Sequence, residues 1–191
     1  YEAELVEANA REAAAASRAA LLASLETHLV AELKKEPPAD TEALGEWLRS
    51  QTIDAAAAPL AARAIMKCVL ETAREDPFKM TPILSAIMNR AKLLQLASQP
   101  DGADAKAVNV LQANLCWEVQ AFCHANGWPT ELIKKIFFQL YEKDAVFEDG
   151  FLHWKEDIDD TTPGKEKALF QLIEFFTWLE TADEEDEAGE G

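Results

Sequence analysis

The stretch DAKAVNVLQANLCWEVQAFCHA, residues 104–125, decides the fold class. Large apolar residues recur in it at intervals of three and four, and they cover more than one side of a helix. These residues are Val108, Leu111, Leu115, Trp117, Val119 and Phe122. The pair Asn126-Gly127 follows, which is typical of a helix that ends in a left-handed turn. The stretch therefore predicts a central helix that other elements cover on several sides.

The same spacing continues on both sides of this stretch. Only seven glycines occur in the chain, and most prolines fall between the candidate helices. Further helices are expected over residues 2–36, 41–52, 54–74, 81–97, from 130 onward, over 148–158 and over 164–182. Thr41 is expected to cap the second of these. Short connections favour antiparallel neighbours. The predicted fold class is therefore all-α: stacked antiparallel helical hairpins in a HEAT-type solenoid of about eight helices.

Three regions differ in composition. Residues 1–20 are rich in alanine, which favours a helix but offers little to bury, and they are expected to be a linker or an exposed helix extension. Residues 21–182 are expected to form the helical domain, and residues 183–191 an acidic, disordered tail. The chain starts at Tyr1, so it is expected to be a piece of a longer protein.

Charge and hydropathy exclude several classes of function. The chain carries 18 basic and 35 acidic residues, a net charge of −17. A field of this sign repels phosphate backbones and attracts basic polypeptides, so direct nucleic-acid binding is not expected. No apolar run is long enough for a membrane span, and no secretion signal is visible. A cytoplasmic, monomeric domain without a membrane contact is expected.

Three cysteines, Cys68, Cys116 and Cys123, cannot all pair with one another. Their number suits a reducing compartment, in which thiols are buried as small apolar groups. The alternative is a metal site with His124, but neither a CxxC motif nor a second nearby histidine accompanies it. Core packing is the preferred interpretation, and no metal or cofactor is expected.

Two segments mix large aromatic residues with carboxylates: FFQLYEKDAVFEDGFLHWKEDIDD at residues 137–160 and FFTWLETADEEDE at residues 175–187. Residues 142–160 contain eight acidic and two basic residues, and residues 180–191 contain seven acidic residues and no basic one. One interpretation is that the aromatic residues build the core while the carboxylates form solvated faces. The other is a docking surface for a basic segment, in which charge sets the register. The two are compatible.

We therefore assign separate roles within these segments. The aromatic residues expected to build the fold are Phe137, Tyr141, Phe147, Phe151, Trp154, Phe175, Phe176 and Trp178. The carboxylates expected to contact a partner are Glu142, Asp144, Glu148, Asp149, Glu156, Asp157, Asp159, Asp160, Glu180, Asp183, Glu184, Glu185, Asp186 and Glu187.

The strings WKEDI at 154–158, PGKEKALFQ at 163–171 and WLETA at 178–182 resemble a known family. They are similar to the paired aromatic and acidic boxes of translation-initiation factor 4 gamma and its relatives, of factor 5 and of the epsilon subunit of factor 2B, with the 4 gamma branch closest. The resemblance covers residues 104–187, and the boxes correspond to residues 141–160 and 175–187. Residues 1–20 fit no motif of the family.

The resemblance implies a HEAT-type docking domain of an initiation scaffold. It implies as partners the lysine-rich segment of the initiation factor 2 beta subunit and, in the 4 gamma branch, the MAP-kinase-interacting kinases. An enzyme is not expected, because neighbouring carboxylates such as Glu156 and Asp157 do not face each other on a helix and no catalytic motif occurs. Two alternatives remain: guanine-nucleotide exchange, as in the factor 2B epsilon subunit, and a structural spacer.

Overall fold

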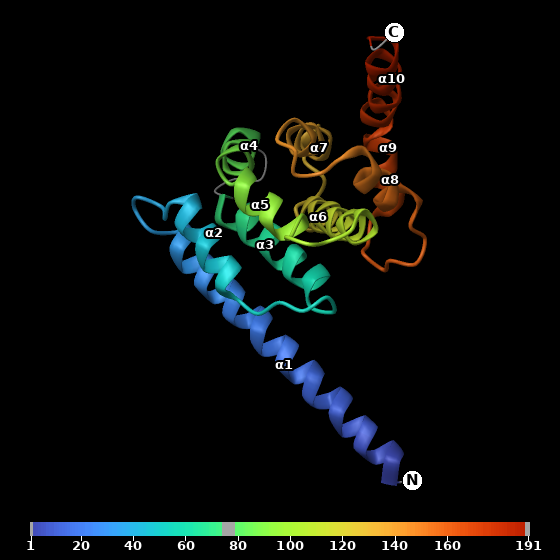
Figure 1. The fold of residues 1–191 in the computed structure, drawn as a ribbon. Coiled ribbons are helices and arrows are strands. Elements are labelled where there is room, and N and C mark those ends of the chain that lie inside the picture. Colours follow the sequence, from blue (N-terminus) through green and yellow to red (C-terminus); the bar gives the residue numbers. More distant parts are fainter. Residues whose placement is uncertain (1, 74–78, 190–191) are drawn as a thin grey trace.

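The computed structural model describes residues 2–73 and 79–189, with side chains described up to residue 182. The described residues form ten helices and no strand, which confirms the all-α class (Figure 1). They are α1 Glu2–Leu33, α2 Thr41–Ser50, α3 Ala58–Ala73, α4 Met80–Asn89, α5 Ala91–Ser98, α6 Ala105–Ala125, α7 Leu132–Glu142, α8 Glu148–Glu156, α9 Lys165–Gln171 and α10 Ile173–Gly189. The predicted break at Asp76-Pro77 lies outside the described residues.

Helix α6 occupies the centre of the molecule, as its sequence predicts. It packs against α3, α5, α7 and α8 (Figure 1). Its N-terminus begins after Asp104, whose carboxylate accepts a hydrogen bond of 2.8 Å from the backbone N–H of Ala107. This bond satisfies one of the N–H groups that a helix start leaves unpaired. The large apolar side chains of α6 that face its neighbours are buried, among them Leu115, Val119 and Phe122.

The expected number of eight helices is too low, because two predicted helices are each divided. The stretch 81–97 is split at Arg90 into α4 and α5. The Arg90 guanidinium donates hydrogen bonds of 2.7 Å to the carbonyl oxygen of Ala39 and to the Thr41 hydroxyl. Helix α2 begins at Thr41 and its N-cap residue is Asp40, so the predicted capping by Thr41 is wrong. The Thr41 hydroxyl instead joins α2 to the α4–α5 junction through Asn89 and Arg90. The second split lies at the fully buried Leu172, between α9 and α10.

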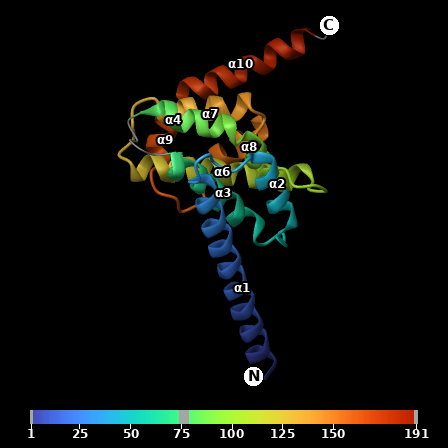
Figure 2. The ribbon, with the colours of Figure 1, turned by 90° about the vertical axis from the view of Figure 1, so that its left-hand side faces the viewer.

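The two ends of the chain project from the helical body. Helix α1 packs on α3 through its C-terminal part, while every residue from 2 to 17 is exposed (Figure 1). Helix α10 crosses near α7 and then leaves the body (Figure 2). The helix continues to Gly189, into the segment for which a disordered tail was predicted. The predicted boundaries at residues 20 and 183 stay predictions.

The three cysteines lie in the core. Cys68, Cys116 and Cys123 are buried free thiols on α3 and α6. Burial raises the pKa of the Cys68 thiol to about 11 and that of Cys123 to about 12. The protonated thiols thus pack as small apolar groups, and the core interpretation is confirmed.

Candidate docking surface

An aromatic cluster joins α7, α8 and α10. Its members are aromatic residues of the two segments at 137–160 and 175–187. The ring of Phe137 lies 5.2 Å from the rings of Phe151 and Trp154 and 5.5 Å from that of Phe175, measured between centroids. These four side chains are fully buried, and Phe176 is nearly so. Tilted and edge-to-face rings at such distances stabilise a core beyond their buried area. Five of the eight aromatic residues assigned to the fold therefore lie in its core.

The other three aromatic residues are less enclosed. Tyr141 is half-buried, whereas Phe147 and Trp178 are 44% and 37% exposed. The Trp178 ring covers the side of α7, where its centroid lies 4.8 Å from that of Phe138 and 5.1 Å from that of Tyr141. Trp178 thus packs on one side and faces solvent on the other.

The predicted carboxylates fall into two groups with different surroundings. Six are exposed: Glu142, Asp144, Asp149, Glu156, Asp159 and Glu180. Glu148, Asp157 and Asp160 are partly buried. The side chains of Asp183, Glu184, Glu185, Asp186 and Glu187 lie outside those that the structure describes.

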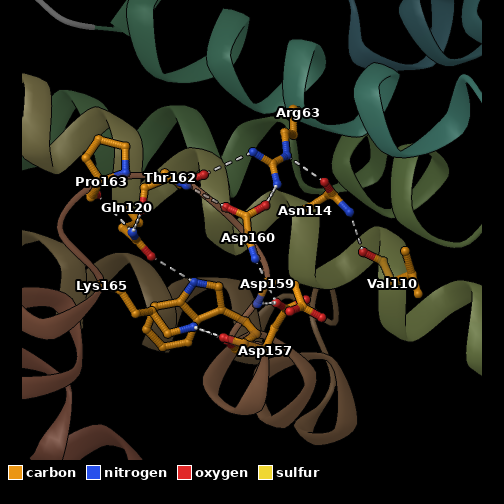
Figure 3. A network of polar contacts seen from close by, with 11 residues as sticks. Arg63, Val110, Asn114, Gln120, Asp157, Asp159, Asp160, Thr162, Pro163 and Lys165 are labelled. Carbon is orange, nitrogen blue, oxygen red and sulfur yellow. Dashed lines mark hydrogen bonds and ion pairs between the residues drawn. The ribbon is translucent and has the colours of Figure 1, made fainter.

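Asp157 and Asp160 hold in place the loop that follows α8, residues 157–164 (Figure 3). The Asp157 carboxylate accepts hydrogen bonds from the backbone N–H groups of Asp159, at 2.8 Å, and Asp160, at 3.0 Å. Helix α8 therefore ends at Glu156, two residues before its predicted end, because this side chain binds the backbone that would continue the helix.

Asp160 joins this loop to α3 through an ion pair with Arg63. Arg63 also donates hydrogen bonds to Asn114 of α6, at 2.6 Å, and to Thr162, at 3.2 Å (Figure 3). Burial alone would raise the pKa of Asp160. Hydrogen bonds from Thr162 and Arg63, together with the charge of Arg63, outweigh burial and hold that pKa below its usual value.

Lys165 follows the loop directly and bonds back to the residues at its start. Its ammonium group donates to the carbonyl oxygens of Trp154 and Asp157. It lies 4.1 Å from the Trp117 ring centroid and 4.2 Å from that of Trp154, so it makes cation–π contacts on two sides. Desolvation in this position lowers the pKa of Lys165 to about 8, although Asp157 and Asp160 act in the opposite direction.

Gln120 of α6 connects the loop to the aromatic cluster. Its side-chain N–H group donates to the carbonyl oxygens of Thr162, at 3.0 Å, and Pro163, at 2.9 Å. Its oxygen accepts a bond of 3.2 Å from the Trp154 indole N–H. Gly164 follows with φ +89°, and an added Cβ there would stand 2.5 Å from the Trp128 ring. We call Arg63, Asn114, Gln120, Asp157, Asp160, Thr162 and Lys165 the loop network.

The loop network changes the roles expected from sequence. Asp157 and Asp160 engage groups of their own chain, so Glu156 and Asp159 are the carboxylates of the WKEDI region that remain exposed. Sequence reasoning missed Arg63, Asn114 and Gln120. The only signal for each of them in the sequence is that a polar residue lies within the apolar face of its helix, α3 or α6.

The loop and the aromatic cluster lie within a segment that matches one family model. This model is W2, described as eIF4-gamma/eIF5/eIF2-epsilon, and it covers residues 111–189. The similarity to the W2 family extends over residues 111–189 of the 191-residue chain. The resemblance that the three sequence strings carry is thereby confirmed.

Individual relatives agree with this assignment. Eukaryotic translation initiation factor 4 gamma 2 from Homo sapiens is 41% identical over 76 residues, which is 40% of this chain and 8% of that protein. Factor 4 gamma 3 from Mus musculus is 27% identical over 156 residues, or 80% of this chain and 9% of that protein. Factor 4 gamma 1 from Mus musculus is 31% identical over 127 residues, or 65% of this chain and 7% of that protein. The chain thus matches less than a tenth of each relative.

Two further findings concern other classes of site. None of the described helices is long and apolar enough to span a bilayer. Among the described residues, no group of three or more histidine, cysteine, aspartate or glutamate side chains could hold a metal ion.

Proposed function

We propose that this W2-containing chain is a non-catalytic docking domain of a cytoplasmic translation-initiation scaffold. The domain recruits basic protein segments, with the lysine-rich segment of the initiation factor 2 beta subunit and the MAP-kinase-interacting kinases as partners. The observation that carries the proposal is the pair of exposed carboxylates Glu156, at the end of α8, and Asp159, within the loop that the loop network fixes.

A fixed loop favours docking because its charges need no ordering when a partner binds. Each exposed ion pair contributes only about 0–1 kcal/mol, so binding must combine several contacts. The other exposed carboxylates lie on α7, in the turn after it, on α8 and on α10: Glu142, Asp144, Asp149 and Glu180. Such binding is expected to weaken as salt increases.

The test is a titration of the chain with the lysine-rich factor 2 beta segment at low and high ionic strength. The double reversal Glu156→Lys and Asp159→Lys should lower the low-salt affinity about tenfold. The control reversal, Glu12→Lys with Glu46→Lys, changes the net charge equally at exposed positions on α1 and α2. Absence of binding at both ionic strengths contradicts the proposal, and equal effects of the two reversals reduce it to a non-specific charge effect.

The segment 183–187 is tested separately. Reversal of Glu184, Glu185 and Asp186 should weaken capture of the same peptide at low salt if these residues contribute to docking. Unchanged capture removes them from the binding surface. A GDP-release assay with initiation factor 2 tests the exchange alternative, and the docking proposal predicts no acceleration.

A further inference from the structure

Two large apolar side chains face solvent where α9 meets α10. Phe170 is 75% exposed and Ile173 is 57% exposed. Both border one hollow of about 440 Å³, which Thr130 and Glu131, just before α7, and Lys134 of α7 also line. Neighbouring exposed apolar residues at the rim of a hollow are more typical of an interaction site than isolated ones. We call this surface the Phe170 hollow.

The polar rim of the Phe170 hollow has an excess of negative charge. Glu131 and Glu174 share the single ammonium group of Lys134, at 2.5 Å and 2.7 Å. Two carboxylates against one cation leave one negative charge uncompensated at this rim. The hydrogen bonds that Lys134 donates to Glu131 and Glu174 raise the pKa of Lys134, so this cation stays protonated and the charge excess stays fixed at neutral pH.

Gln171, between the two apolar residues, also borders the hollow. Its side-chain oxygen is buried and accepts no hydrogen bond from any described residue. A buried acceptor without a donor costs free energy. The features of the hollow that a partner can reach are its apolar side chains and its acidic rim.

We propose that the Phe170 hollow binds a large aliphatic side chain of a basic partner segment. A lysine or arginine next to that side chain meets the carboxylates of Glu131 and Glu174. This inference rests on the proposed docking function and adds an apolar requirement to the partner. A segment made only of lysines would bind the acidic surface around Glu156 and Asp159 and leave the hollow empty.

Apolar and charged contacts respond differently to salt, which separates this hollow from the acidic surface. Salt screens exposed charges, whereas burial of an aliphatic side chain persists at high ionic strength. The apolar anchor should therefore account for a growing share of the affinity as salt rises. Central, well-buried anchors commonly carry most of the binding free energy of an interface.

The experiment compares two lysine-rich peptides that differ at one central position, leucine or alanine. The wild-type chain should bind the leucine peptide about tenfold more tightly at both ionic strengths. The double variant Phe170→Ala and Ile173→Ala should bind both peptides equally. Leu60→Ala removes a comparably exposed apolar side chain from α3 and should keep the preference. A thermal melt checks that each variant is folded.

Each result separates this inference from the proposed function. If the wild type binds both peptides equally with the expected salt dependence, the apolar anchor is wrong and the docking function stands. A leucine preference that survives in the double variant places the anchor elsewhere and also overturns the inference. If neither peptide binds, the docking function fails first. Sedimentation that shows self-association lost only in the double variant assigns the hollow to a second copy of the chain instead.

Discussion

The first half of α1 and the loop at residues 157–164 present opposite combinations of local order and tertiary contact. Residues 2–17 form a regular helix, yet all of them are exposed. The loop has no regular secondary structure, yet its side chains and carbonyl oxygens bond to side chains of α3, α6 and α9. Regular backbone hydrogen bonds alone give a short isolated helix marginal stability, whereas long-range polar contacts fix an irregular segment. The loop is therefore the better support for a binding surface.

The largest effect should come from removal of Arg63. The change Arg63→Ala deletes the ion pair to Asp160 and the bonds to Asn114 and Thr162, and it should lower the free energy of unfolding by about 3 kcal/mol. Urea unfolding measures this, with Arg49→Ala on the exposed side of α2 as the control. If both changes cost less than about 0.5 kcal/mol, the loop does not depend on its polar contacts.

A second prediction separates crowding from backbone strain. Gly102 and Gly164 have similar left-handed φ values of +80° and +89°, but only at Gly164 would a Cβ meet other atoms. Gly102→Ala should cost about 1 kcal/mol from backbone conformation alone. Gly164→Ala should cost about 2 kcal/mol more, because Trp128 must move. Equal losses of stability for the two variants in thermal unfolding would show that Trp128 moves aside without cost.

A third prediction concerns acid. Because the folded-state pKa of Asp160 is lowered, the folded state binds its proton less readily than the unfolded chain does. This group therefore contributes stability above its unfolded pKa, which is lost as pH falls through the folded value. In Asp160→Asn, stability should decline less than in the wild type between pH 5 and pH 2, a window set by the ordinary aspartate pKa of about 3.9 and its lowering. Parallel urea midpoints for the two proteins across this range contradict the assignment.

The smallest effect should follow deletion of residues 1–15. Because every described residue in this range is exposed, the free energy of unfolding should change by less than about 0.5 kcal/mol. Hydrogen exchange should find the amides of 2–17 poorly protected and those of the buried part of α6 strongly protected. Strong protection of residues 2–17 in the isolated chain would mean that this helix packs on something.

The sequence predicts what local patterns encode. The spacing of Val108, Leu111 and Leu115 was enough to predict the central helix, and Asn126-Gly127 marked its end correctly. The divisions at Arg90 and Leu172 were missed because neither position carries a glycine or proline. At Arg90 the helix divides beside a side chain that bonds to residues about fifty positions away, and no local pattern reports such a contact.

The candidate site was predictable in part for the same reason. Burial of Phe137, Phe151 and Trp154 follows from helical spacing and aromatic size. For the four carboxylates of EDIDD at residues 156–160, however, composition predicts the same role, contact with a partner. Only the positions of Arg63 and of the local backbone distinguish Asp157 and Asp160 from Glu156 and Asp159.

The Arg63–Asp160 pair also bears on where this structural unit begins. The two residues lie 97 positions apart, and Arg63 precedes the family match at 111–189 by 48 residues. A piece cut at residue 111 would retain the whole matched segment and lose α3, the helix that carries Arg63. Its loop would then keep the bonds of Asp157, Lys165 and Gln120 and lose the connection to α3 through Arg63. The smallest piece that can be moved between proteins intact is therefore longer than the segment that matches the family model.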